Sequence, residues 1–135
     1  KWATDKRGTD RNAKPFEIPG NGLGLFSSRK NSWPGFNNKF RGFGGEEYYI
    51  HEKYRKNNRK AMCLPFMKWL HRFERPGGRE YKLEIEHVVR NYILEFIELE
   101  LDLLPIYEHF VKQNDFDEIV YNSFVREAQY LYKRE

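Results

Sequence analysis

The clearest pattern along the chain is a helical repeat of apolar residues between positions 83 and 100. Its apolar members are Ile85, Val88, Val89, Tyr92, Ile93, Phe96, Ile97 and Leu99. The charged members set against them are Glu84, Glu86, Arg90, Glu95 and Glu98. Spacings of three and four residues give a helix one broad apolar face and leave the charged residues on the opposite side. The pattern predicts an amphipathic helix over 83–100.

Shorter patterns predict the remaining elements. We expect helices over 46–56, from Pro105 onward and over 115–132, the last with Asp115 as its N-cap and Asp117 in its first turn. Gly-Leu-Phe at 24–26 is typical of a short buried strand, and Pro65 divides an apolar stretch into strand segments 60–64 and 67–71. Short strands among helices indicate a mixed α/β fold.

Charge is divided unevenly along the 135 residues. Residues 1–60 hold 14 Lys and Arg against 6 Asp and Glu, whereas residues 61–135 hold 10 against 14. A basic half rich in aromatic residues suits nucleic acid or another phosphate-bearing ligand. The single cysteine excludes an intramolecular disulfide and fits a reducing compartment, and no apolar run approaches the ~20 residues of a membrane span. We therefore expect a soluble, cytoplasmic protein without a membrane segment.

A cluster of glycines and carboxylates precedes the helix predicted over 46–56. Gly42, Gly44 and Gly45 stand directly before Glu46 and Glu47, and such a cluster permits a close approach of the backbone to something else. One interpretation is that the two carboxylates only complement the positive end of the helix dipole. The other is that they accept hydroxyl donors of a sugar whose apolar face lies on the neighbouring aromatic ring. Four-residue spacing along the helix directs at least one carboxylate inward.

His71 is the second candidate. It ends the segment Phe-Met-Lys-Trp-Leu-His between Lys68 and Arg72, where one histidine is either an edge residue of a strand or a ligand for manganese or zinc. Asp115 and Asp117 are better explained as helix-start residues than as metal ligands. The chain has no nucleophile elbow, phosphate-binding loop or dinucleotide fingerprint.

The order of these motifs resembles the C-terminal half of the catalytic domain of GT-A fold glycosyltransferases. The likeness is greatest to polypeptide N-acetylgalactosaminyltransferase-like enzymes and their microbial or phage relatives. In that group a Gly-Leu-Phe strand is followed by a Trp-Gly-Gly-Glu corner, a helix, and a strand running from proline to histidine. Here the corner reads Phe43-Gly44-Gly45-Glu46 and the last strand runs from Pro65 to His71, with Trp33 between the first two motifs.

The resemblance implies a site residue by residue. Glu46 and Glu47 would be the catalytic carboxylates, and His71 would be one ligand of a manganese ion whose other ligands lie upstream. The residues implied to bind substrate are Gly24, Leu25, Phe26, Trp33, Phe43, Gly44 and Gly45. Lys68 and Arg72 are added as substrate-binding residues on their charge alone, which suits the diphosphate. The implied reaction moves a sugar from a nucleotide-diphosphate donor to a hydroxyl of a glycan or protein acceptor.

One departure from the family concerns the nucleotide-binding half, which would lie upstream of Gly24, where only 23 residues stand. Either the nucleotide-binding half lies upstream in a longer polypeptide, or it is lost and the second half persists alone as this chain, which begins with Lys1. Within it we expect a surface arm or linker at 1–15, a catalytic subregion at 16–80 and a helical extension at 81–135. Two alternatives remain: a non-catalytic basic and aromatic module that binds nucleic acid or glycan, and a structural domain of a larger assembly.

Overall fold

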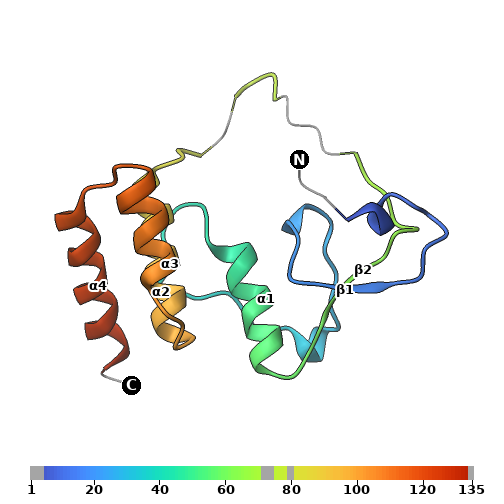
Figure 1. Cartoon of the computed structure of the whole chain (residues 1–135), viewed down its shortest axis with the longest axis horizontal. Coiled ribbons are helices and arrows are strands. Elements are labelled where there is room, and N and C mark those ends of the chain that lie inside the picture. The colour runs from blue at the N-terminus through green and yellow to red at the C-terminus, as the bar shows by residue number, and fades with distance from the viewer. Residues whose placement is uncertain (1–4, 71–74, 79–80, 134–135) are drawn as a thin grey trace.

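The computed structural model describes residues 5–70, 75–78 and 81–133 and combines four helices with a two-stranded sheet (Figure 1). It is 48% helical and 5% strand, which agrees with a mixed α/β class in general. Within the described residues, no helix is both long enough and apolar enough to cross a membrane.

The sheet and the first helix form one part of the molecule. Strand β1, Phe16–Ile18, pairs antiparallel with β2, Ala61–Cys63, and Lys60 reaches across to Glu17 at 2.8 Å. Helix α1, Glu46–Lys56, lies between this sheet and the other helices (Figure 1). Short 3-10 turns at Lys6–Gly8, Leu23–Leu25 and Lys30–Ser32 connect the strand region.

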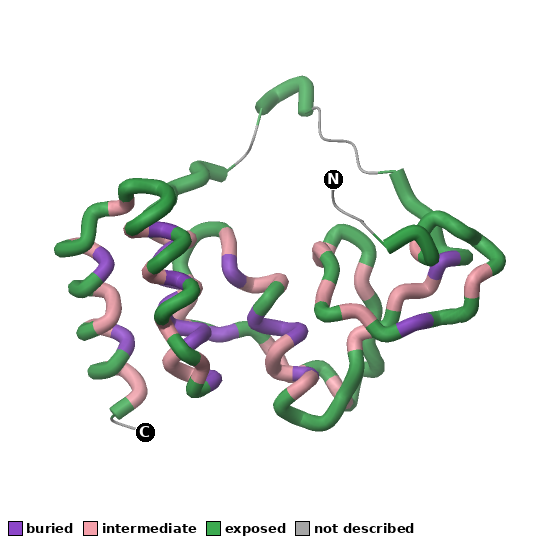
Figure 2. The backbone as a smooth tube through the Cα atoms, viewed as in Figure 1, coloured by how far each residue is buried: buried purple, intermediate pink, exposed green. Residues whose placement is uncertain are grey.

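The C-terminal helices pack around α2, Ile85–Glu98. Helix α3, Leu104–Tyr107, continues into a π-helix at Glu108–Gln113, and α4, Glu118–Tyr132, packs along α2. Figure 2 shows buried positions along both α2 and α1. The buried core residues of this part are Val89, Ile93, Leu94, Phe96, Ile106, Phe110, Tyr121 and Ala128. The predicted helix over 83–100 is confirmed, with slightly narrower bounds.

Helix α2 also holds the loop that leads into α1. The buried side chain of Asn91 donates to the carbonyls of Arg41 and Gly44, and its oxygen accepts the Arg41 N–H. Arg90, 3% exposed, donates to the Lys39 carbonyl and forms a bidentate pair with Glu127 of α4. Two adjacent residues of one helix therefore fix the backbone of residues 39–44.

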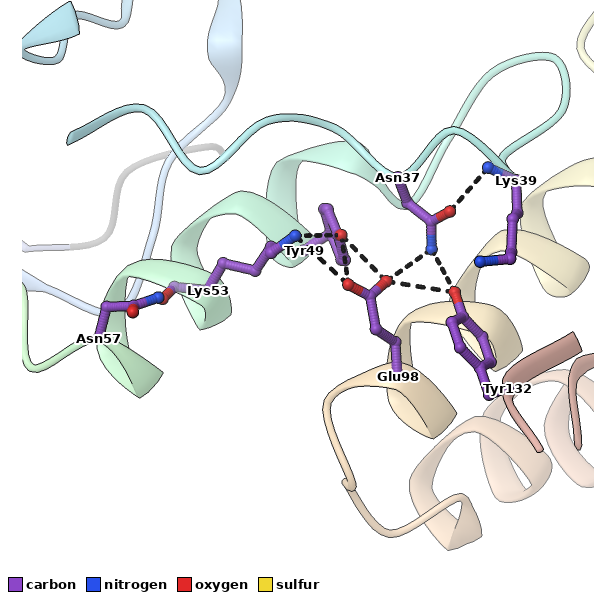
Figure 3. Close-up of polar contacts among 7 residues, drawn as sticks. All are labelled: Asn37, Lys39, Tyr49, Lys53, Asn57, Glu98 and Tyr132. Atoms are coloured by element: carbon purple, nitrogen blue, oxygen red, sulfur yellow. Dashed lines mark hydrogen bonds and ion pairs between the residues drawn. The ribbon is translucent and has the colours of Figure 1, made fainter. Parts of the chain in front are cut away.

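A polar network around Glu98 joins the same elements about two turns further along α2 (Figure 3). The Glu98 carboxylate accepts from Tyr49 of α1, Asn37 of the loop and Tyr132 of α4, and Lys53 lies 3.3 Å away. Burial and this carboxylate both raise the pKa of Tyr49, so its hydroxyl remains a donor. The network stabilises the junction of α1, α2 and α4.

Four sequence-based predictions are wrong in detail. Gly24–Phe26 is no strand but the end of a 3-10 turn, and residues 67–70 form no strand either. The Asp117 carboxylate caps α4 by accepting from the N–H groups of Ile119 and Val120, whereas Asp115 adopts a left-handed φ of 53° outside the helix. Arg90 and Glu95, expected on the solvent side of α2, are buried, because α1 and α4 leave that helix little free surface.

Candidate functional site

The glycine cluster is explained first by helix α2. Gly42, Gly44 and Gly45 all have positive φ values, which residues with a Cβ adopt only with strain. A Cβ on Gly42 would lie 2.5 Å from His87 Nδ1, and one on Gly44 would lie 2.9 Å from Val88 Cγ2. The feature that approaches these glycines is therefore a helix of the same chain.

Gly44→Ala tests this explanation. We expect it to lower the free energy of unfolding by about 2 kcal/mol, because the new methyl group adds a contact with Val88 to the strain of the positive φ. Urea unfolding measures the loss, and Gly35→Ala is the matched control because Gly35 also has a positive φ, 76°, but a Cβ there meets open space. Equal losses in the two variants would contradict the packing role of Gly44.

The two carboxylates of the corner are held by backbone N–H groups. Glu46 Oε2 accepts from Gly44 N at 2.9 Å, and Glu47 Oε1 accepts from Leu23 N at 3.0 Å. Both glutamates lie in the first turn of α1, where negative charge is favoured by the helix dipole. These bonds agree with the first interpretation, in which the carboxylates complement the start of the helix, and the sugar interpretation stays a prediction.

An open hollow of about 410 Å³ lies beside this corner. It is lined by Phe43, Gly44, Gly45, Glu46, Glu47, Leu83, Ile85, Val88 and Tyr92. The Phe43 ring stacks on Tyr81 with centroids 4.9 Å apart and planes 16° apart, which extends the aromatic surface at its rim. Five residues implied by the resemblance, Phe43 to Glu47, therefore meet at one hollow that also has apolar walls.

The 20–26 segment rests on α1 and does not line this hollow. A Cβ on Gly24 would collide with the Trp69 ring, and His51 Nε2 lies 2.9 Å from the Asn21 carbonyl oxygen and 3.1 Å from its backbone N. Phe26 packs against His51 and Trp33, with ring centroids 5.9 and 6.1 Å apart. These contacts explain the glycines of this segment as places where side chains cover the backbone.

Trp33 and Leu25 are also away from the corner. Trp33 lines a second hollow of about 200 Å³ with Asn57 and Arg59, and Leu25 is 40% exposed. Lys68 is exposed, and its Nζ is 3.5 Å from the Thr9 carbonyl. The predicted substrate-binding residues thus fall into two groups on different parts of α1 and its neighbouring loops.

The manganese prediction depends on residues outside the described structure. His71 and Arg72 lie outside the described residues, and the described part of the chain brings together no group of three His, Cys, Asp or Glu side chains that would hold a metal ion. The described residues therefore do not by themselves form the implied manganese site.

Glu95 is the most unusual ionisable residue of the structure. It is fully buried on α2, and neither carboxyl oxygen has a hydrogen-bond partner among the described residues. Burial, with smaller contributions from Glu52 and Glu98, raises its pKa to about 9, so the side chain is protonated at neutral pH. The sequence spacing could have predicted this burial. Glu95 follows Tyr92 by three residues and precedes Leu99 by four, which places it at the centre of the apolar face.

Tyr92 lies between Glu95 and the hollow along the same helix face. Burial raises the pKa of Tyr92, and the nearby charges of Glu95, Glu46 and Glu47 raise it further. The phenol therefore keeps its proton at neutral pH, and Tyr92 is one of the residues that line the hollow.

Comparisons with protein-family models, with curated proteins and with solved structures give no match for this chain.

Proposed function

We propose that this chain is the acceptor-side half of a GT-A type glycosyltransferase, which moves a sugar from a nucleotide-diphosphate donor to an acceptor hydroxyl. The observation that carries the proposal is the hollow at the start of α1, where two carboxylates and an aromatic ring come together. A pocket of this size, mostly apolar with a few polar groups, is typical of a small-molecule site.

The link between the corner and the Gly-Leu-Phe segment supports the same proposal. The Leu23 N–H donates to Glu47, so the segment that contains Gly24 is attached to the helix that carries both carboxylates. Trp69, from the segment that leads toward His71, covers Gly24. The Gly-Leu-Phe segment therefore contacts the corner through Glu47 and, 45 positions further along the sequence, Trp69 of the segment that leads toward His71.

The chemistry of the corner suits a sugar hydroxyl. A carboxylate has several lone-pair positions, so Glu46 can accept from a hydroxyl while one oxygen keeps its bond to Gly44 N. In that position it would orient the acceptor hydroxyl and take up its proton as the new glycosidic bond forms. The Phe43 ring would lie against the apolar face of the sugar. Glu47, already bonded to Leu23, would position the loop beside it.

The donor side of the proposal rests on the resemblance. A nucleotide-binding half and the manganese ion with His71 as one ligand are its expectations, and contacts of Lys68 or Arg72 with the diphosphate are expected from their charge alone. If bound, the metal would stabilise the charge of the departing nucleotide.

Sugar transfer by the polypeptide that carries this chain together with its predicted nucleotide-binding half tests the proposal. We expect release of nucleoside diphosphate from one or more nucleotide sugars with manganese and an acceptor present. Glu46→Gln should lower turnover at least about 100-fold, because the amide cannot accept the proton. Glu100→Gln is the control, since its side chain is 90% exposed and belongs to another region.

Full turnover in Glu46→Gln would contradict the catalytic assignment. If every nucleotide sugar remained intact, the chain would instead be assigned to the non-catalytic alternative. A nucleic-acid module would then be recognised by affinity that falls steeply with salt and is not lowered by Glu46→Ala. The structure does not single out that alternative, because Lys53, Arg55 and Lys60 of its basic segment are paired with carboxylates.

A further inference from the structure

The hollow beside Glu46 has more apolar wall than a sugar alone needs. Phe43, Leu83 and Ile85 line it and are 43%, 53% and 53% exposed, although each is a large apolar side chain. Val88 and Tyr92 complete the wall from α2. Large apolar side chains that stay exposed around one concave site are typical of ligand-binding surfaces.

Polar and apolar groups are separated within this hollow. The carboxylates of Glu46 and Glu47 come from the first turn of α1, whereas Leu83 and Ile85 come from the start of α2 and the residues before it. A ligand that fills the site would therefore present hydroxyl donors to α1 and an apolar group to the 83–88 side. A free monosaccharide, with hydroxyl groups around its whole rim, matches only the first half of this arrangement.

We propose that the acceptor bound at this site is a hydroxyl compound with an attached apolar group, such as a sugar linked to an aromatic or alkyl aglycone. This inference rests on the proposed function and names the acceptor class of the same hollow. A small molecule is favoured over a protein surface because about 410 Å³ is within the range of small-ligand pockets. The stacked pair of Phe43 and Tyr81 extends the apolar surface where the aglycone would leave the hollow.

Matched glycosides test this inference. Calorimetry on this chain would compare the methyl and phenyl β-glycosides of glucose, galactose, N-acetylglucosamine and N-acetylgalactosamine. We expect the phenyl glycoside of at least one sugar to bind about tenfold more tightly than its methyl partner, because the phenyl ring buries additional apolar area. Leu83→Ser should reduce that ratio to about threefold or less, because it removes part of the apolar wall.

Leu104→Ser is the control variant, because Leu104 is 56% exposed on α3 and does not line the hollow. Equal affinities for phenyl and methyl glycosides would overturn the inference and leave the proposed function standing. A phenyl preference that Leu83→Ser does not change would overturn it as well, because the aglycone would then bind elsewhere. Absence of binding by every glycoside would overturn both the inference and the sugar site on which it rests.

Discussion

Glu95→Gln is expected to remove a large pH dependence from the stability of this protein. The folded carboxyl has a pKa of about 9 and the unfolded one a value near 4.5, so between these limits the folded state binds more protons. The free energy of unfolding therefore falls as pH rises, with a slope that approaches about 1.4 kcal/mol per unit. The stability that protonated Glu95 contributes is fully present below pH 4.5 and is lost as pH rises through 9.

The difference between the two proteins isolates this group. Between pH 5 and pH 8, Glu95→Gln should gain about 4 kcal/mol relative to the wild type, because glutamine carries no proton to lose. A constant offset from burying the amide group cancels in that comparison. Urea unfolding at several pH values measures the gain, with Glu100→Gln as an exposed control that should follow the wild type. If the free energy of unfolding changed equally with pH in Glu95→Gln and the wild type, Glu95 would be ionised in the folded protein.

Glu127→Ala is expected to cost about 3 kcal/mol of stability. The carboxylate holds Arg90 through bonds of 3.0 and 2.8 Å, and the same bonds lower the pKa of Glu127. Arg90 is 3% exposed, so removing its partner leaves a buried guanidinium without its counter-charge. Because Arg90 also donates to the Lys39 carbonyl, amide exchange at Arg41 should become faster in the variant.

The Lys56 and Glu100 pair provides the comparison for that variant. Its charged atoms are 4.0 Å apart and the Glu100 side chain is 90% exposed, so Glu100→Ala should cost less than about 0.5 kcal/mol. Similar small losses for Glu127→Ala and Glu100→Ala would mean that Arg90 finds water or another acceptor. The account of how α2 holds the loop before α1 would then be wrong.

The sequence predicts the helices better than the strands. Helix α1 has the predicted bounds of 46–56, and α2 differs from its predicted bounds by two residues at each end, because apolar spacing over several turns determines which face is buried. The 24–26 segment contains the apolar residues of a strand but has no neighbouring strand to pair with, and Trp69 covers Gly24 instead. Strand pairing depends on distant segments that a local pattern does not specify.

The candidate site is predicted in part. The corner from Phe43 to Glu47 forms one side of a hollow, and the binding of a sugar there stays a prediction. Leu83, Ile85 and Tyr92 were missed as site residues. Ile85 and Tyr92 were assigned to the apolar face of a helix, Leu83 was given no role, and only the packing of α2 against the corner places all three at the hollow. The same packing accounts for the positive φ values of Gly42 and Gly44, for which the sequence suggested an external ligand.

A titration followed by amide NMR tests the sugar-binding corner most directly. The N–H of Gly44 donates to Glu46 and that of Leu23 donates to Glu47, so a sugar hydroxyl that shares these carboxylates must change both amide resonances. With the glycosides named above, we predict saturable shifts at Gly44 and Leu23 that Glu46→Ala abolishes at Gly44, because alanine has no side-chain oxygen that the amide and a sugar hydroxyl could share. Unchanged resonances at both amides, or shifts that persist at Gly44 in the variant, would contradict a sugar site at this corner.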